Sequence, residues 1–240
     1  MNSERSSVTE IVKVSSARAA LYRFLSRGFG AEVDESFIET IQKMHPILLS
    51  LAADNDSQDF KQGTHLLGQF VGMIRSDYEK DRHLFLEDLA ADFASLFLNA
   101  DARSVHPVES VYLGEHHLLY EEPYDDVVRI YDLFGFKKKR TVTEPEDHLA
   151  VELEFMAHLC DLTVHSLGDK RIDYAIGFLG NQSEFLDRHL SKWAPLFSGD
   201  LKSVSTNKLY SSLAHLLQGF LSTEASTILQ TSEMANPEKT

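Results

Sequence analysis

The apolar residues of this chain recur every three or four positions along most of its length. That spacing places them on one face of an α-helix, whereas the alternation typical of a half-buried strand never extends beyond four residues. Only 12 glycines and 6 prolines occur in 240 residues, which is few for a sheet protein with many turns. The sequence therefore predicts an all-α fold, an irregular multi-helix bundle with a substantial core.

The apolar spacing and the residues that interrupt it also predict where the helices lie. Pro46 is expected to bend or interrupt the second helix, because proline cannot donate a helical hydrogen bond. The polar residues 1–7 are expected to fray. The expected helices cover residues 9–28, 34–53, 60–80, 86–99, 123–135, 145–166, 173–193 and 203–229.

A basic loop near residues 137–143 is the natural boundary if the bundle is divided. The division would give an N-terminal helical lobe at residues 1–136, a hinge at 137–148 and a C-terminal helical lobe at 149–230. The polar residues 231–240 are expected to form a disordered tail.

The charge balance is acidic, with 37 acidic and 23 basic residues and a net charge of −14. Such a surface repels nucleic acid and anionic lipid and attracts basic partners.

The single cysteine, Cys160, excludes an internal disulfide framework and a CxxC zinc site, and its place on an apolar face predicts a buried thiol. We see no signal peptide and no transmembrane segment, so we expect a soluble, cytoplasmic protein.

Eleven histidines invite a metal interpretation, but the spacing of known sites is missing. The chain has no HExxH, and the pairs His148/Glu152 and Glu154/His158 do not match the Glu-x-x-His of di-iron bundles. It also lacks a GxSxG elbow, a phosphate loop and GxGxxG. We therefore expect no metal, no cofactor and no enzyme activity. A metal-dependent hydrolase that uses the His-rich region and a generic helical peptide-binding adaptor stay open as alternatives.

Residues 104–128 contain no lysine or arginine, although they hold six acidic residues. Three tyrosines, Tyr112, Tyr120 and Tyr124, lie in the same interval. An acidic segment with aromatic rings can attract a basic peptide and pack against its side chains. The alternative is an ordinary solvated acidic loop.

A polar cluster, Thr143 to His148, precedes a long, mostly apolar helical segment. Thr143 and Glu146 have the spacing of a capping box, with Pro145 in the first turn of the helix. Asp147 and His148 would then also lie in the first turn, where the helix dipole favours a carboxylate. Capping and solvation alone would explain the cluster, so its spacing does not establish a function.

Five stretches, in this order, resemble the TorD-type redox-enzyme maturation chaperones, which include the DmsD and NarJ branches. Together they cover roughly residues 90–195, and the first 90 residues fit only in helical character and in Arg18 and Tyr22. The stretches are Asp92 to Phe97, Pro107 to Leu113 (similar to P-x-E-S-V-Y), Glu122 to Gly135, Glu144 to His148 (similar to the EPxDH hinge motif) and Phe185 to Trp193 (similar to F-L-x-x-H-L-x-x-W).

The resemblance implies a cytoplasmic, cofactor-free chaperone. It would bind the twin-arginine signal peptide or the mature body of a molybdenum-containing oxidoreductase, assist cofactor insertion and delay export. It also implies a monomer or a domain-swapped homodimer that exchanges lobes at the hinge, and Glu144 and Pro145 would be the hinge residues. The peptide-binding residues that we expect from it are Asp147, His148, Tyr112, Glu109, Ser110, Pro107, Arg18, Tyr22 and Phe97.

Overall fold

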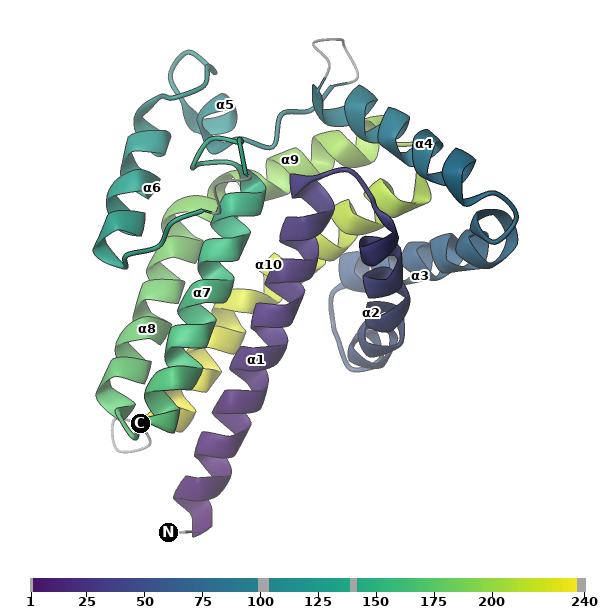
Figure 1. Ribbon diagram of the computed structural model, residues 1–240. Helices are drawn as coiled ribbons and strands as arrows, with labels where there is room; N and C mark the ends of the chain where they lie inside the picture. The colour runs from purple at the N-terminus through teal and green to yellow at the C-terminus, as the bar shows by residue number, and fades with distance from the viewer. Residues whose placement is uncertain (1, 99–103, 139–141, 237–240) are drawn as a thin grey trace.

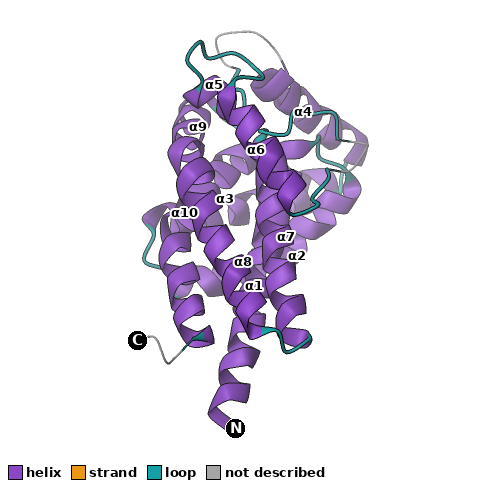
Figure 2. Ribbon diagram, turned by 90° about the vertical axis from the view of Figure 1, so that its left-hand side faces the viewer, coloured by secondary structure: helices purple, strands orange, loops and turns teal. Residues whose placement is uncertain are grey.

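The computed structural model describes residues 2–98, 104–138 and 142–236, and these are helical apart from short connections. No strand occurs among them, only one isolated antiparallel bridge, so the all-α prediction is confirmed (Figure 2). Three short π-helical segments, η1 (Ile74–Tyr78), η2 (Ala94–Leu98) and η3 (Leu186–Leu190), extend neighbouring helices. The α-helices are α1 (Asn2–Gly30), α2 (Glu35–Ala53), α3 (Gln58–Met73), α4 (Arg82–Phe93), α5 (Glu109–Leu113), α6 (Glu122–Leu133), α7 (Leu149–Gly168), α8 (Ile172–Phe185), α9 (Ser191–Val204) and α10 (Lys208–Ala235).

Helices α1, α7, α8 and α10 form the long part of the bundle, and α5 and α6 lie at the end opposite the two termini (Figure 1). Helix α1 packs along α7, and α3 packs along α10. The hydroxyl of Ser26 donates a hydrogen bond of 2.7 Å to the carbonyl of Ala150, which joins the last part of α1 to the start of α7. This end of the bundle carries the motifs singled out in the sequence.

One large hydrophobic core contains side chains from both of the expected lobes. The ring of Phe29 on α1 lies 5.5 Å from that of Phe197 on α9 and 6.4 Å from that of Phe97 on η2. Burying a side chain of this size stabilises a fold by about 1.5–3 kcal/mol. The division into two lobes stays a prediction.

Helix α2 is not interrupted at Pro46, which was one of the two outcomes expected there. Pro46 is on the exposed side of the helix. Water can therefore satisfy the carbonyl group that loses its helical partner there. The start of α2 agrees with the sequence, since the Asp34 carboxylate accepts a hydrogen bond of 2.8 Å from the backbone N–H of Phe37.

The C-terminal boundary was predicted too early. Helix α10 extends to Ala235, so residues 231–235 are helical rather than part of a disordered tail. Tertiary contacts explain the extension, because Thr231 is buried, and Met234 and Ala235 pack against a small cluster formed by Ile11, Leu167 and Ala175. Helix α1 begins at Asn2, so residues 2–7 do not fray as expected. Residues 237–240 lie outside the described part of the chain.

Candidate functional site

Two of the sequence motifs lie side by side at the end of the bundle. The backbone N–H of Glu109 donates a hydrogen bond of 2.9 Å to the carbonyl of Asp147. The backbone N–H of Leu149 donates one of 2.8 Å to the carbonyl of Pro107. Val108 and His148 form the antiparallel bridge between these hydrogen bonds. The structure thus brings the Pro107 segment and the Asp147 segment together, as expected for residues of one site.

Asp147 is completely buried, and its carboxylate is used inside the protein. One oxygen, Oδ2, accepts hydrogen bonds from the backbone N–H of Ser110 at 3.0 Å and from the Ser110 hydroxyl. Burial raises the pKa of Asp147, and the hydrogen bonds from Ser110 act in the opposite direction. Since Val108 offers no side-chain cap to α5, Asp147 provides a cap from a distant segment.

The expected capping box at Thr143 and Glu146 does not form, and α7 begins at Leu149 rather than near Pro145. The bridge to Val108 holds His148 in an extended conformation, so the helix can begin only after it, at Leu149. His148 is the N-cap instead, and its Nδ1 accepts a hydrogen bond of 3.1 Å from the backbone N–H of Ala150. Its ring proton is therefore on Nε2. Burial lowers the pKa of His148 to about 3, so the ring is neutral.

Glu109 points into the bundle rather than into a groove, and it is 1% exposed. Nδ1 of His189 lies 3.0 Å from its Oε2. Glu152 is buried next to it and accepts a hydrogen bond of 3.1 Å from the indole nitrogen of Trp193. Burial and the neighbouring Glu109 raise the pKa of Glu152 well above its ordinary value. Glu109 is therefore part of a buried polar network that connects α5, α7, η3 and α9.

Tyr112 remains partly accessible, as expected for a residue that lines a groove. Its hydroxyl donates a hydrogen bond of 3.1 Å to the carboxylate of Asp200 on α9, and its ring centre lies 5.7 Å from that of Trp193. Burial and Asp200 raise the pKa of the Tyr112 hydroxyl above its ordinary value. Tyr112 therefore connects the surface with the buried network around Glu109.

Arg18 and Tyr22 do not join this site. The guanidinium of Arg18 donates hydrogen bonds of 2.7 Å to the carboxylate of Glu224 and to the side-chain oxygen of Gln182. The Tyr22 hydroxyl donates a hydrogen bond of 2.6 Å to the same carboxylate. Arg18, Tyr22 and Glu224 are all buried between α1, α8 and α10. Their hydrogen-bonding groups are used internally, so the geometry describes a structural ion pair and not a surface for a peptide.

A small cavity of about 130 Å³ opens where the two motifs meet. Five of the expected residues line it: Phe97, Pro107, Glu144, Pro145 and His148. Two exposed leucines, Leu98 and Leu119, lie at the same cavity. Because Leu118 and Tyr120 are also exposed, an apolar surface continues from the cavity along the loop before α6. We call the cavity and these four exposed residues the apolar patch.

The loop that carries the patch is shaped by Glu121. Its carboxylate accepts hydrogen bonds from the backbone N–H groups of His116 at 3.0 Å and Leu118 at 2.7 Å, and these lower its pKa. His117 and Tyr120 have positive φ values of 56° and 63°. Within the acidic interval, the loop between α5 and α6 is therefore folded and presents apolar side chains, and it is not only a solvated acidic run.

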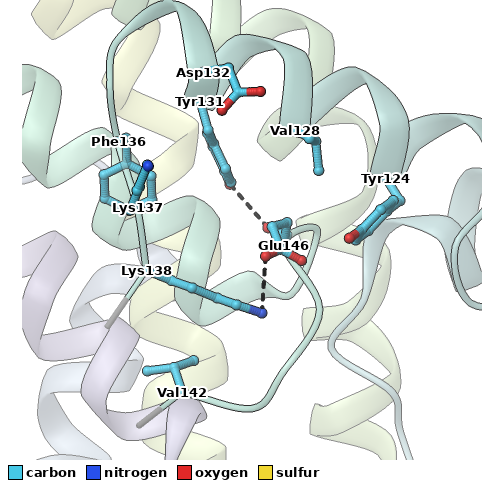
Figure 3. Close-up of a pocket in the computed structure, with 9 residues that line it drawn as sticks. All are labelled: Tyr124, Val128, Tyr131, Asp132, Phe136, Lys137, Lys138, Val142 and Glu146. Carbon is cyan, nitrogen blue, oxygen red and sulfur yellow. Dashed lines mark hydrogen bonds and ion pairs between the residues drawn. The ribbon is translucent and has the colours of Figure 1, made fainter. Parts of the chain in front are cut away.

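A second, larger cavity of about 430 Å³ borders the same turn (Figure 3). Its walls include the rings of Tyr124 and Tyr131, and Glu146 and Lys138 face each other across it. Nζ of Lys138 lies 3.2 Å from Oε1 of Glu146 and also donates to the carbonyl of Glu144. The ring of Tyr120 packs on that of Tyr124 at 5.0 Å, so this cavity adjoins the apolar patch.

Residues 53–198 match the family model described as nitrate reductase delta subunit. This chain belongs to that family, the TorD/NarJ family. The TorD/NarJ resemblance seen in the motifs is therefore confirmed.

Several relatives are similar along most of their length, and each is named chaperone protein TorD. One from Vibrio parahaemolyticus is 28% identical over 92% of this chain and 98% of its own. Another from Vibrio cholerae is 31% identical over 88% of this chain and 92% of its own. A third from Photobacterium profundum is 30% identical over 92% of this chain and 98% of its own. This TorD/NarJ protein therefore belongs among chaperones and not among enzymes.

Three residues of the network were not predicted as site residues of this TorD/NarJ protein: Glu152, His189 and Trp193, although the last two lie in the Phe185 to Trp193 motif. Glu152 lies between Leu149 and Met156 on an otherwise apolar helical face, and an acidic residue there is a signal of a buried partner. The partner itself could not be found from spacing, because His189 and Glu109 are 80 positions apart.

No group of three or more ligating side chains is placed to hold a metal within the described ranges. No helix there is long and apolar enough to cross a membrane.

Proposed function

We propose that this TorD/NarJ protein is a cytoplasmic chaperone for a molybdenum-containing oxidoreductase. It binds the twin-arginine signal peptide or the mature body of that enzyme, holds it while the cofactor is inserted, and delays its export. The names of its relatives support the chaperone role, and the motifs that resemble the family support the kind of client.

The apolar patch is the observation that carries the proposal. A twin-arginine leader has two guanidinium groups followed by an apolar stretch, so its receptor needs an apolar surface beside carboxylates. Leu119 and Tyr120 are 49% and 62% exposed, and exposed apolar clusters of this kind often mark interaction sites. No lysine or arginine occurs in residues 104–128, and the net charge of −14 attracts a basic segment.

The motif residues take two different roles in this proposal. Phe97, Pro107 and Tyr112 are partly accessible or line the cavity, so they can contact a peptide. Ser110 and Asp147 are buried, so they position the rim of the cavity without touching the peptide. Replacing Asp147 and His148 by alanine would therefore disturb folding and binding together, and it is not a clean test.

Exposed residues of the patch provide a cleaner test. Leu119→Ser should weaken the binding of a synthetic twin-arginine leader about tenfold in calorimetry, which corresponds to about 1.4 kcal/mol of lost apolar contact. Leu229→Ser is the matched control, because Leu229 is at least as exposed, at 60% against 49%, but lies near the end of α10. Unchanged affinity in a folded Leu119→Ser protein would contradict the site.

Salt provides a second measurement on the same complex. Affinity should fall as ionic strength rises, because screening weakens attraction between the acidic surface and the two arginines. A leader with both arginines replaced by glutamine should bind more weakly and show little dependence on salt.

A further inference from the structure

The cavity of Figure 3 contains an ion pair formed by the protein with itself. Lys138 and Glu146 are both about three-quarters buried, with side-chain exposures of 23% and 28%. The Lys138 ammonium approaches Oε1 of Glu146 at 3.2 Å, and it also donates to the Glu144 carbonyl. Figure 3 shows the Lys138 side chain reaching across the cavity to Glu146, with Tyr124 on the opposite wall. A cation therefore already occupies the anionic corner of the cavity.

The remaining walls suit a flat cation better than an ammonium group. Tyr124, Tyr131 and Phe136 contribute aromatic rings, and Asp132 contributes a second carboxylate at the exposed side. Burial and the nearby Glu146 carboxylate raise the pKa of Tyr124 to about 12. A guanidinium pairs with a carboxylate through two parallel hydrogen bonds and stacks on aromatic rings, whereas an ammonium is a compact and strongly hydrated charge.

We propose that this cavity is a binding site for an arginine side chain, and that Lys138 holds the cation position until the arginine of a client displaces it. The inference rests on the proposed function and assigns its arginine contact to Glu146. When Lys138 leaves, Glu146 and Asp132 face the incoming guanidinium, and the aromatic rings pack against its stem. The exchange conserves charge in the cavity, so a buried carboxylate is never left unpaired.

The position of the cavity agrees with one continuous ligand. The turn at residues 144–148 borders both this cavity and the apolar patch. Tyr120 of the patch packs on Tyr124 of the cavity with ring centres 5.0 Å apart. A basic segment followed by an apolar segment can therefore place an arginine beside Glu146 and its apolar side chains on Leu119 and Leu98.

An internal competitor lowers the apparent affinity for the external ligand, because only the fraction of molecules with Lys138 displaced can bind. Lys138→Met keeps most of the side-chain volume and removes the charge. It should increase the affinity for a twin-arginine leader three- to tenfold in calorimetry. Glu146→Gln removes the carboxylate and should decrease the affinity about tenfold.

Lys137→Met is the matched control, because Lys137 lines the exposed rim of the same cavity and the change of net charge is the same, while the contact of Glu146 with Lys138 is kept. Its affinity should stay within twofold of the unchanged protein. A leader with glutamine in place of both arginines should bind the Lys138→Met and Lys137→Met proteins equally. Circular dichroism and melting temperature establish that all three variants are folded.

The possible results separate this inference from the proposed function. If the leader binds but Lys138→Met and Lys137→Met have the same affinity, the arginine site is wrong and the proposed function stands. If no leader binds, the leader-binding part of the proposed function fails, and the amide of the dipeptide Arg-Arg is then titrated and followed by NMR. Stronger binding of that dipeptide to Lys138→Met than to Glu146→Gln supports the site, and equal binding overturns it.

Discussion

The carboxylate of Asp147 accepts a hydrogen bond of 3.0 Å from the backbone N–H of Ser110, a residue 37 positions earlier in the chain. The Ser110 hydroxyl donates to the same oxygen. This contact, together with the bridge between Val108 and His148, joins α5 to the start of α7. The two motifs that resemble the family therefore act as one structural unit beneath the apolar patch.

Asp147→Ala should destabilise the protein by about 2–3 kcal/mol, because it leaves two buried donors of Ser110 without an acceptor. Asp147→Asn keeps an acceptor at the same place and removes a buried charge. Its loss of stability should therefore be at least about 1 kcal/mol smaller than that of Asp147→Ala, or about half of it. Urea unfolding at neutral pH measures both values. Equal losses for the two variants would show that the acceptor is unimportant.

Glu152→Gln should become more stable relative to the unchanged protein as the pH rises from about 5 to 8. Because the folded-state pKa of Glu152 is raised, its contribution to stability is present at low pH and is lost as pH increases. The free energy of unfolding of the unchanged protein falls by at most about 1.4 kcal/mol per pH unit for this group. The variant shows no such fall, because glutamine cannot titrate. Glutamine also keeps an acceptor for the indole nitrogen of Trp193.

Urea unfolding of both proteins at several pH values measures that difference. Glu154→Gln is a suitable control, since Glu154 lies on the same helix and is partly exposed. Parallel stability curves for the Glu152→Gln variant and the unchanged protein would argue against a proton held at Glu152.

His148→Asn should show the opposite dependence on pH. The unfolded chain takes up a proton at His148 near pH 6.5, whereas the folded protein does so only at about pH 3. The contribution of His148 to stability is therefore present above pH 6.5 and is lost as the pH falls. Between pH 7.5 and 5, His148→Asn should gain about 2 kcal/mol relative to the unchanged protein, since asparagine also caps a helix without titrating.

NMR provides a direct check of the same residue. The imidazole signals of His148 should not shift between pH 8 and 5. A midpoint of titration near 6.5 for His148 would contradict its role as a buried, neutral cap.

Arg18→Met should destabilise the protein by about 3–5 kcal/mol, because it leaves the carboxylate of Glu224 buried without its cation. The double variant Arg18→Met with Glu224→Leu removes both charges and should recover at least half of that loss. Chemical denaturation of the single and double variants gives the coupling energy. If Arg18 contacted a peptide instead, its replacement would change leader binding and leave stability unchanged.

The helices themselves could be predicted closely from the sequence, because their pattern is local. Asp34 begins α2 as the sequence indicates, and Leu149, Leu153 and Met156 are buried on α7 as their spacing indicates. The end of α10 could not be predicted, since residues 231–235 have no strong apolar pattern. Contacts with α1 and α7 stabilise that last turn.

The site was predicted only in part. The spacing of Pro107 and Pro145 does not reveal that both line one cavity, and the family resemblance gave Pro107 to the groove but Pro145 only to the hinge. Glu109 and Asp147 were expected at the surface of that groove, and both are buried. Exposure of a polar side chain depends on which distant segment packs over it, and sequence spacing contains no such information.

The sequence alone determined the all-α class, the faces of the helices, the acidic charge and the order of the family motifs. Each of these depends on residue type and on spacing along one segment. Tertiary structure decided the start of α7 at Leu149, the pairing of Arg18 with Glu224 and the burial of Asp147. A bridge, an ion pair and a buried carboxylate each need a partner from another part of the chain, so they exist only once the helices have packed.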